Sequence, residues 1–207
     1  MAIDRDKVVA EALCLLDDEG LEALSLRRLG TRLGVQAPTL YWHIADKRAL
    51  LDALADVIMD EALAAIVPPA RKQGWAPWLL DALVQVRAAV LRHRDGARLV
   101  AGARAALRRA DFSELAASTL VQQGVDPQRA RLLVLTAERY TFGYVLEEQA
   151  SDASRPGTSA NATSDPDPDE LRQRFPVLTD AIGAYFADGR TADDLFRDGL
   201  CLILGLG

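Results

Sequence analysis

The stretch GVQAPTLYWHIADKRALLDAL, Gly34–Leu54, decides how the first part of this chain folds. It places Tyr41, Trp42 and His43 side by side, directly before a helix signal. A helix of only two turns buries one side, so Leu40 and Ile44 can serve a core while three consecutive residues cannot. We therefore expect some of these aromatic side chains to face outward.

Start and stop signals divide the chain around this stretch into four helices. Asp4, Ser25 and Asp46 are suitable N-caps, Gly20 can end the first helix, and Pro38 fits the first turn of a helix. The expected helices run to Glu19, from Ser25 to Gly34, from Ala37 to Ile44, and from Asp46 to a point before Pro68. Two short helices joined by a glycine-containing turn, after a longer first helix, have the spacing of a helix-turn-helix. In such a unit the second short helix lies in the DNA major groove.

Charge is unevenly distributed along the chain. The net charge of -6 is unfavourable for binding a polyanion. However, residues 1–22 carry two basic and seven acidic side chains, whereas residues 23–50 carry five basic side chains and one acidic, a local balance of +4. Any contact with nucleic acid is therefore expected to be confined to the second segment.

The chain of 207 residues is expected to be all-α, with a helix-turn-helix domain followed by a larger helical domain. Ala, Leu, Arg and Glu are abundant, and apolar residues recur at three- and four-residue spacing. The expected units are a DNA-binding domain at 1–48, a connecting helix at 49–66 and a ligand-binding and dimerisation domain at 67–207. In the last unit the expected helices are 75–92, a short piece from 95, 111–123, 127–149, 169–187 and 191–206. Residues 150–170 have almost no large apolar side chain and predict a flexible loop.

The sequence argues against a membrane protein and against an enzyme. No apolar stretch approaches the roughly 18 residues of a membrane span, and the N-terminus lacks the pattern of a signal peptide, so a cytoplasmic protein is expected. With two histidines, no metal-ligand cluster and no phosphate-binding glycine loop, we expect no catalytic site, no metal and no cofactor. Cys14 and Cys201 lie among leucines and are expected to pack as small apolar residues.

The segment LSLRRLGTRLGVQAPTLYWHIADKRALLDALA, residues 24–55, resembles the DNA-binding region of tetracycline-responsive members of the tetracycline-repressor (TetR) family. The resemblance returns at LRHRDGARLVAGAR, at YTFGYVLEEQ and at FPVLTDAIGAYF, so it covers nearly the whole chain. It implies a homodimeric transcriptional repressor that binds a palindromic double-stranded operator and is released by a small-molecule inducer. The alternative is a constitutive or architectural DNA-binding protein without a ligand.

The resemblance also implies which residues contact the operator. The expected set is Arg27, Arg28, Ala37, Pro38, Thr39, Tyr41, Trp42, His43 and Lys47. At Ala37 tetracycline repressors carry a glutamine that reads a base, and alanine has no such donor or acceptor, so a different operator sequence is expected. The alternatives are a solvated helix face for the two arginines, core packing for Tyr41, a helix cap for His43 and a plain surface charge for Lys47.

The expected ligand site departs from that of tetracycline repressors, which hold a magnesium-bound drug with histidines, an asparagine and a threonine. The corresponding positions here are Leu63, Ala82, Val86, Val100 and Ala103, none of which can ligate a metal. Of the polar set only Glu147 is present. Together with Tyr140 and Tyr144, these residues predict a pocket for a small hydrophobic or aromatic inducer that needs no magnesium. The alternative is that they fill a closed core.

Two apolar segments and one basic run complete the expectations for the larger domain. Residues 130–146 and 195–207 are too apolar for exposed helices and suit a four-helix dimer interface, in which Gly143 and Gly199 would allow close approach. Burial within one subunit is the alternative. The run of arginines from Arg87 to Arg109 is expected to be a solvated surface with ion pairs to acidic residues, and not a second nucleic-acid surface.

Overall fold

The computed structural model describes residues 3–103, 105–153 and 167–206. Over these residues the chain is all-α, as predicted, with eleven α-helices, one short 3-10 helix and no strand. None of the described helices is both long enough and apolar enough to cross a membrane. The elements are α1 (Arg5–Glu19), η1 (Leu21–Ala23), α2 (Leu26–Leu33), α3 (Ala37–Leu40), α4 (Lys47–Ala65), α5 (Trp75–Leu91), α6 (Gly96–Gly102), α7 (Leu107–Gln122), α8 (Pro127–Ala153), α9 (Pro168–Arg174), α10 (Pro176–Phe186) and α11 (Ala192–Leu204).

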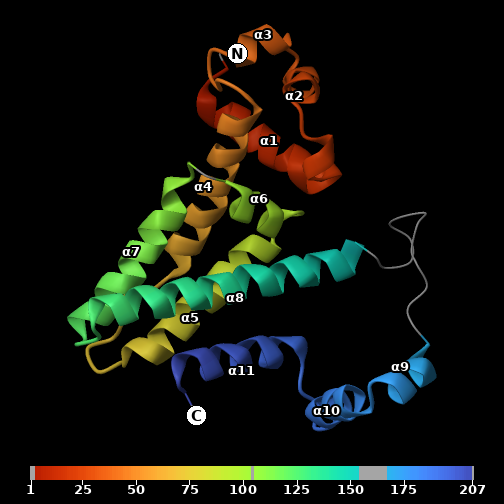
Figure 1. Cartoon of the computed structure of the whole chain (residues 1–207). Coiled ribbons are helices and arrows are strands. Elements are labelled where there is room, and N and C mark those ends of the chain that lie inside the picture. Colours follow the sequence, from red (N-terminus) through yellow and green to blue (C-terminus); the bar gives the residue numbers. More distant parts are fainter. Residues whose placement is uncertain (1–2, 104, 154–166, 207) are drawn as a thin grey trace.

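Helix α4 connects the two parts of the molecule. Helices α1, α2 and α3 form a small unit at one end, and α4 runs from this unit into a larger body built from α5, α6, α7, α8 and α11 (Figure 1). One continuous hydrophobic core passes through both parts, from Leu29 and Leu40 through Leu54 and Met59 to Val86. Helix α4 buries side chains along its whole length, so it packs against both parts.

Helices α9 and α10 stand apart from the larger body (Figure 1). They pack mainly on each other, and neither buries a residue. The apolar side chains Val177, Leu178 and Ile182 of α10 are therefore exposed. These two helices add little to the core of the single chain.

The predicted helix signals are confirmed at the residues that carry them. The carboxylate of Asp4 accepts a hydrogen bond from the Lys7 N–H at 2.8 Å, and Asp46 does the same for the Ala49 N–H at 2.8 Å. The Ser25 hydroxyl accepts a longer hydrogen bond from the Arg28 N–H, at 3.3 Å, at the start of α2. These caps satisfy backbone donors that have no partner within the helix, which fixes where each helix begins.

Two expected helices end or divide where the sequence did not predict it. The third helix ends at Leu40 and not at Ile44, because residues 41–43 form a turn in which the His43 and Ile44 N–H groups both donate to the Leu40 carbonyl. The single helix expected over 169–187 is divided between Phe175 and Pro176, where the proline ring lacks the N–H that helix continuation needs.

Two further differences concern lengths. Helix α7 begins at Leu107, four residues before the predicted start, and α8 continues to Ala153. Of the loop predicted at 150–170, residues 154–166 lie outside the described residues. The ends of that segment that the structure describes are mostly helical.

The expectation for Cys14 is wrong, because its side chain is exposed. Helix α1 buries Val8, Ala12, Leu15 and Leu16 on one face, and Cys14 lies on the other. Cys201 is partly buried and packs against the core, as expected.

Within the arginine run from Arg87 to Arg109, three exposed arginines form the predicted ion pairs, while Arg104 lies outside the described residues. Arg92 pairs with Glu61 at 2.7 Å, Arg98 with Glu22 at 2.8 Å, and Arg108 with an acidic residue of α4 at 2.8 Å. These guanidinium groups are occupied by carboxylates of the same chain, so the run does not form a free cationic surface.

Candidate nucleic-acid interface

The interface is built on a tight turn between α2 and α3. Gly34 ends α2 in the left-handed conformation, with φ of 69°, and the Val35 N–H donates to the Gly30 carbonyl at 2.9 Å. A glycine adopts this conformation without the steric cost that a side chain would add. Pro38 then lies in the first turn of α3, where its missing N–H leaves no donor unpaired.

The aromatic side chains after α3 divide as the sequence predicts. Leu40 and Ile44 are buried in the core, while Tyr41 is 55% exposed and Trp42 is 89% exposed. The alternative that Tyr41 fills the core of the small unit is therefore wrong. The two adjacent rings therefore present apolar surface to solvent at this end of the molecule.

The remaining residues predicted at this surface flank the two exposed rings. Pro38 and Thr39 are exposed on α3, and His43 is partly buried in the turn that follows. Ala37 is the first residue of α3, and its side chain lies outside the described part of the chain.

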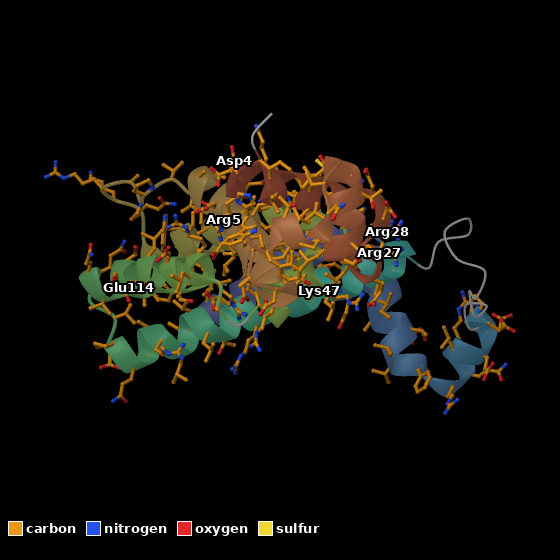
Figure 2. The ribbon with its side chains drawn as sticks, turned by 90° about the horizontal axis from the view of Figure 1, so that it is seen from above. Asp4, Arg5, Arg27, Arg28, Lys47 and Glu114 are labelled. Carbon is orange, nitrogen blue, oxygen red and sulfur yellow. The ribbon has the colours of Figure 1, made fainter. Side chains whose placement is uncertain are left out.

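The cations at this end of the molecule differ in whether they form ion pairs within the chain. Arg28 pairs with Glu19 of α1, and Arg32 donates to two carboxylates of α1 at 2.6 and 2.8 Å. By contrast, Arg27 and Lys47 are exposed and have no ion-pair partner among the described residues. Figure 2 shows Arg27 and Arg28 side by side and Lys47 apart from them, all in the view onto this end of the chain.

The acidic helix α1 thus pairs with Arg28 and Arg32 and leaves Arg27, Lys47 and Arg48 of the basic segment without a described ion-pair partner. Arg5 is a further exposed cation without a described partner, and the sequence reasoning missed it because Asp4 and Asp6 flank it. Exposed aromatic rings on the same small unit as exposed cations suit the phosphate backbone of DNA, since phosphates attract the cations and the rings pack on the sugars.

The residues predicted to bind a ligand lie in or against the core of the larger body. Ala82 and Val86 of α5 and Val100 of α6 are buried. Leu63 and Ala103 are partly buried and pack against the same core. No group of His, Cys, Asp and Glu in the described ranges is arranged to hold a metal ion. The surroundings of these five residues are therefore mainly apolar.

The two predicted tyrosines lie together near α11. The rings of Tyr140 and Tyr144 are 5.7 Å apart and both lie within 5.7 Å of the Phe196 ring. The Tyr144 hydroxyl donates to the Ala192 carbonyl at 2.8 Å. Burial raises the pKa of Tyr140 to about 12, so its phenol stays neutral under ordinary conditions. Glu147, the last of the predicted set, is exposed.

Two charged residues inside the larger body were not predicted as special. Arg87 donates to Glu148 at 2.9 Å and pairs with Asp193 at 2.7 Å, and the hydrogen bonds to these carboxylates raise its pKa against the effect of burial. Glu138 is buried in α8, and the Ser113 hydroxyl donates to it at 2.6 Å. Burial raises the pKa of Glu138. Helical periodicity predicts which face of a helix such residues occupy, but it does not predict which other helix packs on that face.

Comparison with protein families matches both parts of the chain. The family described as "Bacterial regulatory proteins, tetR family" matches residues 8–54, and "Tetracyclin repressor-like, C-terminal domain" matches residues 68–206. The tetracycline repressor protein class A from transposon 1721 of Escherichia coli is 36% identical over 200 residues, which are 95% of this chain and 87% of that protein.

Solved structures show the same fold in DNA-bound and drug-bound proteins. A TetR variant from Acinetobacter baumannii AYE in complex with minocycline has a TM-score of 0.75 and 32% identity, with 99% of this chain and 96% of that chain covered. BioQ with its natural double-stranded DNA operator has a TM-score of 0.65 and 30% identity, with 76% of this chain and 94% of that chain covered.

The helix-turn-helix surface on a helical second domain defines a one-component transcription regulator. The two family matches together cover most of the chain. The chain belongs to the tetR family of bacterial regulatory proteins, and it is a ligand-responsive transcriptional repressor.

Proposed function

We propose that this chain represses transcription by binding a palindromic operator as a homodimer, with α3 in the major groove. The observation that carries the proposal is the exposure of Tyr41 and Trp42 together with Arg27 and Lys47, which have no ion-pair partner among the described residues. Arg27 reads a base edge, whereas Lys47 binds phosphate. Because residue 37 is alanine, its position reads no base through a bidentate hydrogen bond, and the operator differs there from that of tetracycline repressors.

Dimer formation uses the exposed apolar residues of α8 and α11. Leu132 of α8 is 64% exposed and Leu202 of α11 is 87% exposed, and Leu146 and Leu195 on the same helices are exposed as well. Two such helices from each subunit form a four-helix interface that covers these side chains. A two-fold dimer then presents its recognition helices about 34–36 Å apart, which matches successive major grooves on one face of DNA.

The inducer is a small hydrophobic or aromatic molecule that needs no magnesium. The buried Ala82, Val86 and Val100, with Leu63 and Ala103 beside them, offer apolar contacts and no metal ligand. Such an inducer lowers operator affinity by its preference for another separation of the recognition helices, and α4 carries that change. The protein acts by binding and not by catalysis, and it does so in the cytoplasm, where its operator is found.

Three units make up the chain in this proposal. Residues 1–48 bind DNA, residues 49–66 form the connecting helix, and residues 67–207 bind the ligand and dimerise. The alternative is a constitutive DNA-binding protein, for which no small molecule changes the operator affinity.

The DNA surface is tested with a triple alanine variant of Arg27, Tyr41 and Lys47. Affinity is measured by fluorescence anisotropy for a duplex selected from a randomised DNA pool by the wild-type protein. A double alanine variant of Arg71 and Lys72 removes the same charge from the connection between α4 and α5, at the far end from α3 (Figure 1), and serves as the control. We expect the triple variant to lose binding and the control to keep it, and equal affinities would show that the interface lies elsewhere.

The ligand class is tested by titrating tetracycline with magnesium into the protein–DNA complex. We expect no release, because the side chains that hold the metal and the drug in tetracycline repressors are absent. Anilinonaphthalene sulfonate, an aromatic probe, is expected to bind equally well with and without EDTA. Release at micromolar tetracycline would show that other residues of the pocket replace the lost polar groups.

A further inference from the structure

His93 lies at the junction between the small unit and the larger body. It belongs to the turn between α5 and α6 and is only 7% exposed. Its Nδ1 is 3.0 Å from Oδ2 of Asp17 on α1, and its Nε2 is 3.3 Å from each carboxylate oxygen of Glu61 on α4. One imidazole ring therefore bridges carboxylates from two helices that carry the DNA-binding surface.

This geometry selects one protonation state of the ring. A neutral imidazole has one donor and one acceptor nitrogen, whereas an ionised carboxylate only accepts. Both nitrogens of His93 face a carboxylate, so only the imidazolium donates to both. Burial would raise the pKa of Glu61, but hydrogen bonds from Arg92 and His93 outweigh it and hold that pKa below its usual value. Glu61 is therefore an ionised acceptor near neutral pH.

The contacts around His93 belong to a wider polar junction with α1 and η1. The Arg94 N–H donates to Asp17 at 3.1 Å, and the Leu21 N–H donates to Asp95 at 2.8 Å. Gly20 lies so close that a Cβ there would be 3.0 Å from the side chains of both Arg94 and Asp95. The end of α1 thus meets the turn through polar contacts in addition to the hydrophobic core, and such contacts depend on charge.

The turn is also fixed from the opposite side, by α8. Nε2 of Gln149 donates to the His93 carbonyl at 2.8 Å, and Oε1 of Gln149 accepts from the Ala97 N–H at 3.1 Å. Because α8 is a proposed dimer helix, the His93 bridge connects the dimer core to the DNA-binding unit. Its strength therefore influences how firmly the recognition helix is oriented.

We propose that His93 is a positioning residue for operator binding, which as an imidazolium holds α1 and α4 in place and on losing its proton releases them. The inference rests on the proposed operator binding. A DNA-binding unit that is already oriented loses less conformational freedom on binding, so loss of the proton lowers operator affinity. Repression by this protein then weakens as pH rises through the ionisation of His93.

Acidic and basic groups surround the ring. The flanking groups are Asp17 and Asp18 on α1, Glu61 on α4, Arg92, Arg94 and Asp95 in the turn, and the neutral Gln149 on α8.

The test compares pH profiles of DNA affinity between about pH 6 and pH 8.5, a range that spans histidine ionisation. The probe is a duplex selected from a randomised pool by the full-length wild-type protein at the acidic end. We expect wild-type affinity to fall by about 5- to 150-fold over this range, the usual size of coupling between sites. His93→Gln should bind weakly with only the pH dependence that His43 contributes, and His93→Arg, a permanent cation, should stay tight at the alkaline end.

Glu61→Gln keeps the shape of the junction and removes one carboxylate. It should move the midpoint of the profile to lower pH, an effect that a merely structural role for His93 would not produce. Parallel profiles for wild type and His93→Gln, or an unchanged midpoint in Glu61→Gln, would overturn the inference. If His93→Gln does not fold, the midpoint of the Glu61→Gln profile tests the inference by itself.

An NMR titration of the ring separates this inference from the proposed function. The chain has two histidines, so His43→Gln leaves His93 as the single imidazole signal. If the wild-type protein selects no DNA at any pH, the proposed function fails. The imidazole signal tests the bridge independently of DNA, because a ring that is neutral at about pH 6 refutes the bridge even in a protein that binds an operator.

Discussion

The contact between α8 and α11 makes Gly199 a sensitive position for substitution. A Cβ at Gly199 would lie 2.1 Å from Oη of Tyr140 and 2.5 Å from its Cζ, which is far below van der Waals contact. The Tyr140 ring is not free to withdraw, because it stacks on Phe196 with an interplanar angle of 14° and its hydroxyl donates to a backbone carbonyl of α11 at 3.3 Å. We therefore expect Gly199→Ala to expel this ring.

The size of the effect follows from the contacts that are lost. The hydrogen bond of the phenol contributes about 1 kcal/mol. Its ring contacts with Phe196 and Tyr144 contribute about 1 kcal/mol each. Alanine in the middle of α11 recovers about 1 kcal/mol of helix propensity over glycine. The net loss of unfolding free energy is about 2 kcal/mol, which corresponds to a fall of about 4–8 °C in Tm for a chain of this size.

Thermal unfolding followed by circular dichroism measures this loss, with Tyr140→Leu as the second arm of a double-mutant cycle. In the Tyr140→Leu background the collision is absent, so Gly199→Ala should be neutral or stabilising, and the coupling should be about 3 kcal/mol. Additive effects of the two substitutions, or a Gly199→Ala protein as stable as wild type, would refute the reasoning.

A spectroscopic titration gives an independent check. Because burial raises the pKa of Tyr140 to about 12, its contribution to stability is fully present below the usual pKa of 10.0 and is lost as pH rises from there through about 12. In Gly199→Ala the ring is in water, so the tyrosinate absorbance should develop earlier in the titration and this loss of stability should disappear.

Substitutions at four further positions have defined outcomes. Burial raises the pKa of the Glu138 carboxyl, so Glu138→Gln should raise Tm at pH 7. The gain in Tm should shrink as pH falls toward 4.5, the usual pKa of a glutamate. An equal gain at pH 7 and at pH 4.5 would contradict this reasoning. Thr191→Ala removes the capping box of α11 and should cost about 1 kcal/mol in urea unfolding, while Thr191→Ser should cost almost nothing. Arg32→Gln should reduce stability but leave the salt dependence of DNA binding unchanged, whereas Lys47→Ala should reduce the slope of log affinity against log salt by about 1.

Local signals in the sequence were sufficient for most of the fold. Asp4, Ser25 and Asp46 cap the helices they are predicted to cap, because a side chain that bonds an N–H two or three residues away needs no help from distant segments. The division between Leu40 inside and Trp42 outside is also local, because the short α3 and the turn after it bury Leu40 and Ile44 on one side. The prediction of a single helix over 169–187 was wrong at Pro176, although a proline inside a helical pattern is itself a signal for a helix break.

Other features depend on contacts between distant residues and have no local signal. The sequence predicts both Arg27 and Arg28 as DNA-binding cations, yet only Arg28 forms an ion pair with Glu19. Cys14 has leucine neighbours in sequence but lies on the exposed face of α1. In both cases the environment of the side chain is set by which face of a helix another helix covers, and periodicity alone does not show this.

The sequence by itself determined the helices, the helix-turn-helix and the exposed aromatic surface, because caps, turns and amphipathic periodicity act over a few residues. Only the tertiary structure decided which charges are free and which are occupied. His93 meets Asp17 and Glu61 across 76 and 32 residues of sequence, and these distances close only when α1, α4 and the turn before α6 pack together. Ion pairs between distant helices follow from this packing, since the hydrophobic core brings the helices together and the charged groups at their edges then meet.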